Sequence, residues 1–228
     1  REVPVTVFAA TGANPLKVER MKALGATVVQ EGADFDEAKL AGKRFARERG
    51  LRFVEDGFDP EPAEGAGTIG LELARFPERF DAVLIPLGNG ALFSGVGRAL
   101  QELSPATAAV AVQAAGAPAM TESLRGGRLV EHESVATIAD GIGVRVPIPE
   151  ALDDIRPVLA DTLLVSEESI VEAMRLLHTH TGLVVEPSGA VGVAALLEHP
   201  ERFRGRTVAT ILCGSNLTRK QMGEWLSL

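Results

Sequence analysis

Cysteine is nearly absent from this sequence, since its 228 residues contain one. A single thiol excludes an intrachain disulfide and a metal site built from several cysteines. No apolar run approaches the ~20 residues that a membrane-spanning helix needs. Positive charge is also scarce: 23 lysine and arginine residues face 31 acidic ones, and the net charge is −8. That balance argues against nucleic acid or an anionic membrane as the main partner.

The bulk composition is that of an ordinary α/β protein. Apolar residues make up 46% and charged residues 24% of the sequence. The length suits one large domain or two small ones and allows a proper core. The chain begins with neither a signal peptide nor a methionine, and we expect a cytoplasmic protein.

Strand-like and helix-like segments alternate along the chain. β-Branched and apolar runs predict strands at residues 3–8, 27–30, 82–85, 108–113, 163–165 and 207–212. Helical spacing, N-cap residues and glycine stops predict helices at residues 15–24, 35–49, 65–76, 92–103, 118–124, 167–181 and 190–197, and a last one from residue 218. This alternation predicts the α/β class, with a parallel sheet and right-handed crossovers.

One stretch has the composition of a linker. Residues 56–65 contain Gly57, Asp59-Pro60 and Glu61-Pro62. We expect a domain boundary here, although a loop within one domain would have the same composition. The expected domains are residues 1–55 and residues 56–228.

The most informative turn follows the apolar run at residues 82–85. There Gly88-Asn89-Gly90 joins a predicted buried strand to a predicted helix. Glycine permits positive φ and lets the backbone approach a ligand. Successive N–H groups then converge beside the positive end of a helix dipole, which suits a phosphate. We therefore expect a phosphate-binding loop, with a tight turn that binds nothing as the alternative.

Two further segments occupy positions where ligands gather. Cys213-Gly214-Ser215-Asn216 follows a predicted strand, and in open parallel sheets ligands bind beyond the carboxyl ends of strands. Glu186 is expected near the same edge. Residues 137–143 are too glycine-rich for a strand and too apolar for a solvated loop, so we expect them to lie against a ligand or another backbone.

A dinucleotide site is the natural rival for the glycine turn. The Rossmann fingerprint requires a third glycine and an acidic residue at the end of the following strand. Here Phe93 stands at the third glycine position, and the following strand ends near Gln113. The sequence therefore does not support a dinucleotide site.

Four motifs occur in the order and spacing of one family. They are Gly88-Asn89-Gly90-Ala91-Leu92, Thr137-Ile138-Ala139-Asp140-Gly141, Val185-Glu186-Pro187-Ser188-Gly189-Ala190 and Cys213-Gly214-Ser215-Asn216. On these motifs the chain resembles the pyridoxal-phosphate enzymes of fold type II, in particular the threonine/serine dehydratase and serine racemase group. The resemblance implies a parallel-sheet α/β fold. It also implies that residues 1–55 are the remainder of a small domain and residues 56–228 most of a large cofactor-binding domain.

The resemblance also implies a cofactor, pyridoxal 5'-phosphate, and a role for each matched position. Backbone N–H groups of Gly88, Asn89, Gly90, Ala91 and Leu92 would hold the cofactor phosphate. Gly141 would lie close to the cofactor, Glu186 near the pyridine ring, and Cys213 would hydrogen-bond the pyridine nitrogen.

The reaction implied is β-elimination from L-threonine or L-serine to a 2-oxo acid and ammonia. Some pyridoxal-phosphate folds place an aspartate at the pyridine nitrogen, which keeps the ring protonated and makes it a strong electron sink. A thiol such as that of Cys213 does this less well, so we expect a neutral ring that favours elimination. The alternatives are a serine racemase-like or β-replacement enzyme of the same fold, and a non-catalytic phosphate-binding or interaction chain. The expected partners are a small amino-acid substrate and further copies of the chain.

Two segments of the family pattern are not in this sequence. They are the S-x-K-x-R-G-like segment with the Schiff-base lysine and the S-x-G-N-H-like loop that grips the substrate carboxylate. The lysines present have no such setting; they are Lys17, Lys22, Lys39, Lys43 and Lys220. We therefore expect the C-terminal part of a longer enzyme, inactive alone. Gln113 and Ala119 stand where racemase relatives have acidic metal ligands, so we expect no metal there.

Overall fold

The computed structural model describes residues 3–227, and the chain divides into two compact units. One unit comprises the described residues up to Val54 together with those from Asn216 onward, and the other is Glu55–Ser215. The contacts thus group the C-terminal segment with the first unit. The division into the remainder of a small domain at residues 1–55 and a large cofactor-binding domain at residues 56–228 stays a prediction.

The first unit is built on two parallel strands, with Thr6 opposite Thr27. Its elements are β1 (Thr6–Ala9), α1 (Pro15–Ala23), β2 (Thr27–Gln30), α2 (Phe35–Arg49), α10 (Arg219–Gln221) and a π-helical turn at Met222–Leu226. The C-terminal segment is tied to α1, because Asn14 Nδ2 donates to Asn216 O at 2.7 Å and Arg20 donates to Asn216 Oδ1 at 2.7 Å.

The start of α2 follows the N-cap signal in the sequence. Asp34 accepts a hydrogen bond from Glu37 N at 2.8 Å, and the Glu37 carboxylate accepts one from Ala33 N at 2.8 Å. These two bonds satisfy N–H groups that have no acceptor within the helix. The helix therefore begins where its capping residues predict.

The second unit contains a four-stranded parallel sheet in the order β5-β4-β3-β6. Its strands are β3 (Ala82–Pro86), β4 (Ala108–Ala114), β5 (Asp161–Val165) and β6 (Val208–Thr210). Its helices are α3 (Pro60–Ala74), α4 (Ala91–Leu103), α5 (Ala119–Gly126), α6 (Pro149–Ile155), α7 (Glu167–Thr181), α8 (Pro187–Glu198) and α9 (Pro200–Phe203), with 3₁₀ turns at Asp140–Ile142 and Arg156–Val158. The predicted α/β class with parallel strands is confirmed.

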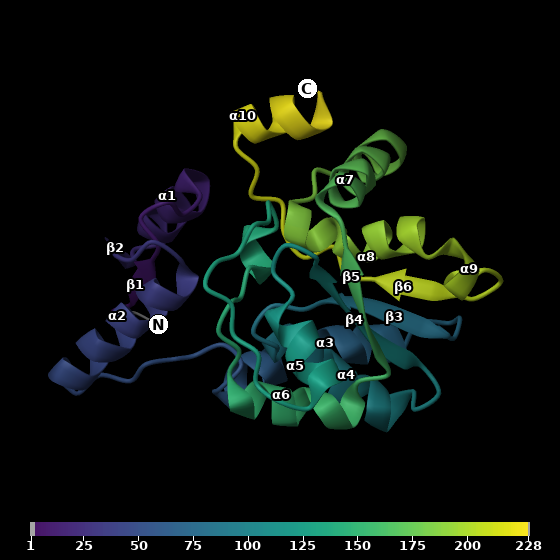
Figure 1. Cartoon of the computed structure of the whole chain (residues 1–228), viewed down its shortest axis with the longest axis horizontal. Helices are drawn as coiled ribbons and strands as arrows, with labels where there is room; N and C mark the ends of the chain where they lie inside the picture. Colours follow the sequence, from purple (N-terminus) through teal and green to yellow (C-terminus); the bar gives the residue numbers. More distant parts are fainter. Residues whose placement is uncertain (1–2, 228) are drawn as a thin grey trace. The chain divides into compact units, whose positions relative to one another are not determined.

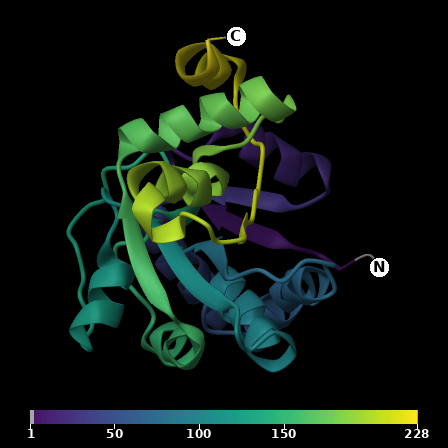
Figure 2. The same cartoon turned by 90° about the vertical axis from the view of Figure 1, so that its right-hand side faces the viewer.

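Helices cover both faces of this sheet. In Figure 1, α3 to α6 lie on one face and α7 and α8 on the other, and Figure 2 shows the same layers from the side. Every residue of β3 is buried, and Phe93 and Leu100 of α4 pack beside it with Ile155 of α6. Burying such side chains contributes about 1.5–3 kcal/mol each. Within the described residues, no helix is long and apolar enough to cross a membrane.

Two helices begin earlier than predicted. Helix α3 starts at Pro60, so the last six of the ten residues of the expected linker, 56–65, are helical. Helix α8 starts at Pro187 instead of residue 190. Proline suits the first turn of a helix, because the N–H that it lacks would have no acceptor there. The prolines therefore mark helix starts at both places, and the linker interpretation of residues 60–65 was wrong.

Helices α3 and α4 touch through their backbones. A Cβ atom added to Gly95 of α4 would lie 2.0 Å from Ala63 O, and one added to Gly70 of α3 would lie 2.9 Å from Val96 O. Real Cβ atoms do not approach other atoms so closely, so this contact requires glycine on both helices. The sheet-facing position of α4 therefore depends on small residues along its outer side.

We expect Gly95→Ala to lower the free energy of unfolding by about 1–3 kcal/mol, because its methyl group would push the two backbones apart. Gly65→Ala is the matched control, since Gly65 lies in α3 and a Cβ atom added to it would have no neighbouring atom within 4 Å. That substitution should raise stability by up to about 1 kcal/mol through helix propensity. Urea unfolding of both variants measures the difference. Equal shifts would contradict the backbone contact.

A charged cluster holds the start of β5. Asp161 forms an ion pair with Arg202 of α9 and accepts a hydrogen bond from Thr162 N at 2.7 Å. Arg125 of α5 donates to Thr162 Oγ1 at 2.7 Å. Burial of the Asp161 carboxyl acts to raise its pKa, but the hydrogen bonds from Arg202 and Thr162 N outweigh it and hold the pKa below its usual value.

Asp161→Asn should therefore destabilise the protein in a pH-dependent way. A carboxyl whose pKa is lowered on folding stabilises the native state above its unfolded pKa, about 3.9 for aspartate. That contribution is lost as the pH falls through the lower pKa of the folded state. Because the side chains of Asp161 and Arg202 are both partly exposed, the loss in free energy of unfolding at pH 7 should be at most about 1 kcal/mol. Urea midpoints at pH 7, 5 and 3 test this; a difference that persists undiminished at pH 3 would contradict it.

Candidate functional site

The glycine turn lies directly between β3 and α4. Gly90 is the N-cap of α4, with φ +116°, a conformation that L side chains rarely adopt. The first helical bond of α4 runs from Ser94 N to Gly90 O at 2.8 Å, and Ser94 Oγ also donates to that oxygen at 3.0 Å. The N–H groups ahead of this bond have no acceptor within the helix and lie at the positive end of its dipole. They form an arrangement that suits an anion.

The segment around Gly141 lies against this turn. A Cβ atom added to Gly88 would be 3.4 Å from Gly141 O. One added to Gly141 would be 2.8 Å from Ser188 Oγ and 3.4 Å from Glu186 Oε1. The turn after β3, the Asp140–Ile142 turn and the first residues of α8 therefore meet at one place.

The segment that follows β6 completes this group. Glu186 N donates to Gly214 O at 3.0 Å, and a Cβ atom added to Gly214 would lie 2.9 Å from each Glu186 carboxylate oxygen. A Cβ atom added to Gly189 would lie 3.1 Å from Cys213 N. Residues 88–92, 137–141, 185–190 and 213–214 are named the loop cluster below. All four motifs singled out in the sequence thus contribute to it.

The topology of the sheet explains why the loop cluster forms. Strands β3 and β6 are parallel neighbours, so the segments that follow them leave the sheet at the same edge. The cluster's segment at residues 137–141 is held from α7, because Glu167 Oε2 accepts a hydrogen bond from Ile138 N at 2.8 Å. It is also anchored next to β4 through the bond from Ala136 N to Gly116 O at 2.8 Å.

The loop cluster contains buried polar side chains. Asn89 and Ser188 are each 3% exposed and Glu186 is 6% exposed, whereas Cys213 is half-buried. Among the described residues, Asn89 Oδ1 and Ser188 Oγ have no hydrogen-bond partner. Buried polar atoms in folded proteins are almost always paired. A ligand that donates a hydrogen bond would satisfy the Asn89 oxygen, and either a donor or an acceptor would satisfy the Ser188 hydroxyl.

Lysine is missing from the unit that carries the loop cluster. Residues 55–215 contain none, and the five lysines of the chain fall in the segments grouped into the first unit. Side chains of the second unit therefore offer no amine for a covalent bond to an aldehyde.

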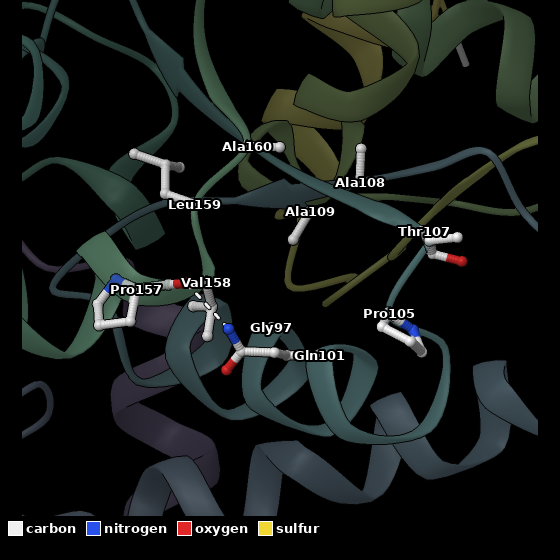
Figure 3. Close-up of a pocket in the computed structure, with 11 residues that line it drawn as sticks. Gly97, Gln101, Pro105, Thr107, Ala108, Ala109, Pro157, Val158, Leu159 and Ala160 are labelled. Carbon is white, nitrogen blue, oxygen red and sulfur yellow. Dashed lines mark hydrogen bonds between the residues drawn. The ribbon is translucent and has the colours of Figure 1, made fainter.

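A pocket of about 290 Å³ lies elsewhere in the second unit (Figure 3). Its wall includes Ala108 at the start of β4, Ala160 just before β5, and Gln101 of α4, whose Nε2 donates to Pro157 O at 3.1 Å. It therefore lies at the amino ends of the strands, and none of its lining residues has an ionisable side chain. This pocket is not the candidate site.

Two residues of the loop cluster, Ser188 and Gly214, were not predicted from the sequence as site residues. Both stand inside motifs that were recognised, but a serine hydroxyl left unpaired by its surroundings has no signature in the sequence. Gln113 is fully buried, and its Oε1 accepts a hydrogen bond from Thr121 N at 3.0 Å. The expected lack of a metal at Gln113 and Ala119 stays a prediction.

The second unit has a parallel sheet, a glycine turn at the start of a helix, and glycine-rich segments at the same strand ends. This combination is typical of proteins that bind phosphate groups. The profile of the family "Pyridoxal-phosphate dependent enzyme" matches residues 1–214. The chain belongs to this family, whose cofactor is pyridoxal phosphate. The resemblance to fold type II enzymes is thereby confirmed. The residues present fit the phosphate of that cofactor, because the N–H groups at the start of α4 have no acceptor within the helix and lie at the positive end of its dipole.

Known proteins similar to the chain include lyases and a racemase. The chain is 38% identical over 219 residues to the L-threonine ammonia-lyase of Geobacter sulfurreducens, covering 96% of the chain and 54% of the relative. The processed form of threonine deaminase isoform 2 from Solanum lycopersicum has 28% identity and a TM-score of 0.89, covering 98% of this chain and 62% of that one. Maize serine racemase has 26% identity and a TM-score of 0.88, with coverages of 97% and 69%. The chain spans about half the length of the curated relatives it matches.

Proposed function

We propose that this chain is the cofactor-binding part of a pyridoxal-phosphate-dependent ammonia-lyase. The reaction proposed is β-elimination from L-threonine or L-serine to a 2-oxo acid and ammonia. The observation that carries the proposal is the loop cluster, in which four separate segments meet beside a helix N-terminus. The similarity to proteins named L-threonine ammonia-lyase supports the choice of reaction and substrate.

In this proposal the backbone binds one end of the cofactor. The N–H groups of Gly88, Asn89, Gly90, Ala91 and Leu92 hold the phosphate. Because the contacts come from the backbone, the side chains of Asn89 and Ala91 are tolerated within the glycine turn. When bound, pyridoxal phosphate supplies an electron sink for the charge left when the substrate loses its α-proton.

In this proposal, three further residues lie close to the pyridine ring of the cofactor. Gly141 has no side chain, which leaves space in front of Glu186 and Ser188. Glu186 places a buried carboxylate near the ring, and Cys213 hydrogen-bonds the pyridine nitrogen. A thiol does not hold a proton on that nitrogen as a carboxylate does, so the ring stays neutral. A weaker sink favours elimination, in which the leaving hydroxyl carries the electrons away.

The chain also requires an amine from outside its second unit. No lysine occurs in residues 55–215, and a proton-abstracting lysine is needed for this chemistry. We infer that the active enzyme works in the cytoplasm as a homo-oligomer and contains further sequence with that lysine. The low cysteine content is in keeping with a reducing compartment.

A second function is favoured by the same missing amine. A chain that binds the phosphate group and has no lysine in residues 55–215 would serve as a non-catalytic phosphate-binding or interaction module. A racemase-like or β-replacement activity of the same fold is a further alternative. Activity measurements on a completed enzyme separate these possibilities.

We expect catalysis when the chain is joined to the segment that precedes the matched region in the Geobacter sulfurreducens relative. The fusion should release a 2-oxo acid and ammonia from L-threonine, because it restores the Schiff-base lysine beside the loop cluster. The 2-oxo acid and ammonia released over time are the measured quantities, alongside the D-amino acid formed from L-serine.

Replacing the supplied lysine by alanine in the same fusion is the control and should abolish release. D-serine formed faster than the 2-oxo acid would identify a racemase. A folded fusion that binds the cofactor and transforms neither amino acid would favour the non-catalytic function.

Cys213 offers a second test in that fusion. Cys213→Ser should keep most of the elimination activity, because a hydroxyl also hydrogen-bonds a neutral nitrogen. Cys213→Asp should lower kcat by about tenfold or more, since a carboxylate protonates the ring and changes the electron sink. Cys213→Asn is the neutral control of the same size, and the absorption spectrum of the bound cofactor reports the protonation state. Equal activity and spectra for the aspartate and asparagine variants would refute the role of Cys213.

A further inference from the structure

We propose that Gly57 is a positioning residue for the phosphate-binding turn, because it sets the orientation of the peptide between Asn89 and Gly90. This inference rests on the proposed function, which makes residues 88–92 a phosphate site. It adds a residue from outside the loop cluster and 31 positions before Gly88 in the sequence.

Gly57 lies against the carbonyl group of Asn89. Its φ is +85°, and a Cβ atom at this position would be 2.5 Å from Asn89 O and 3.2 Å from Asn89 C. The oxygen is the nearer of the two atoms, so the carbonyl is directed at Gly57. Any side chain here would force the Asn89 carbonyl to turn away.

The direction of this carbonyl fixes the next N–H group. Peptide bonds among the described residues are trans, and in a trans peptide the C=O and N–H point in opposite directions. With Asn89 O directed at Gly57, the Gly90 N–H points to the other side of the turn. The following peptide is held as well, since Ser94 N and Ser94 Oγ both donate to Gly90 O, at 2.8 and 3.0 Å. Two successive N–H groups, of Gly90 and Ala91, are thereby oriented before any ligand arrives.

Gly57 is itself held in a closed turn. Asp59 N donates to Glu55 O at 3.0 Å, and Glu55 N donates to Asp59 Oδ2 at 2.6 Å. The turn leads straight into α3, which contacts the backbone of α4 at Gly95. The peptide of Asn89 is therefore backed by a segment joined to the same helix pair that positions α4.

Preorganised donors bind an anion more tightly, because no conformational freedom is lost on binding. A tight turn with no ligand would need no such backing of the two N–H groups. The contact at Gly57 is thus best explained as part of the anion site.

The test compares two probes on the 228-residue chain: pyridoxine 5'-phosphate and pyridoxine. Neither has an aldehyde, so surface lysines do not react with them, and the ratio of their dissociation constants isolates the phosphate. We expect the wild-type chain to prefer the phosphorylated probe. Gly57→Ala should reduce this preference by about tenfold, the equivalent of one charge-assisted hydrogen bond, while leaving the affinity for pyridoxine unchanged.

Gly205→Ala is the matched control. Gly205 has φ +74°, and a Cβ atom added to it would have no neighbouring atom within 4 Å, so its alanine variant carries the same kind of backbone strain without a contact. It should lose stability and keep the phosphate preference. Asp59→Asn is a second variant, which weakens the 55–59 turn without adding an atom beside Asn89. Asp59→Asn should also lower the preference for the phosphorylated probe. It replaces Gly57→Ala as the test variant if Gly57→Ala does not fold.

The outcomes separate the two proposals. A wild-type chain with equal affinity for both probes would refute the phosphate site, and with it the proposed function. A wild-type preference that survives in folded Gly57→Ala, or in Asp59→Asn where the alanine variant is unfolded, would overturn the role of Gly57 alone. Loss of preference in Gly205→Ala to the same extent would show that strain, and not the contact with Asn89, is responsible.

Discussion

The backbone contact between α3 and α4 is the constraint on which the second unit depends. Ala63 O lies where a side chain on Gly95 would have to be, and a Cβ atom added to Gly70 would be 2.9 Å from Val96 O. Because the helices meet at this distance, α4 is held along its outer side as well as along its core side. The position of the N-terminus of α4, and of the glycine turn that precedes it, therefore depends on this contact. The same helix pair connects the Glu55–Asp59 turn to the candidate site.

The candidate site consists of backbone more than of side chains. Glycine stands at the closest contacts between its segments, at Gly141, Gly189 and Gly214, where an added Cβ atom would lie less than 3.0 Å from another atom. A site made of N–H groups binds an anion by geometry and dipole, without a cationic side chain. This explains how an acidic chain with no lysine in residues 55–215 can belong to a family that binds a phosphorylated cofactor.

Much of this arrangement was predictable because local signals coincide with it. The buried strand β3, the start of α4 at residue 91 and the Asp34 cap of α2 follow from apolar runs, glycine and capping residues. Proline was misinterpreted twice. Pro60 and Pro187 indicated a loop by composition, yet each begins a helix, because proline is disfavoured inside helices and suited to their first turn. Composition alone does not distinguish those two positions.

The sequence by itself determined the class of fold, the cofactor family and the four motifs, since each depends on residues adjacent in the chain. Only the tertiary structure decided which of those residues meet and how. Gly141 lies close to Ser188, and Gly57 contacts Asn89 O, and each contact joins segments tens of residues apart. The tertiary structure also leaves Asn89 Oδ1 without a partner among the described residues. Such contacts are set by packing distances between helices and strands, and a distance between two non-adjacent backbones leaves no local pattern beyond the glycine that permits it.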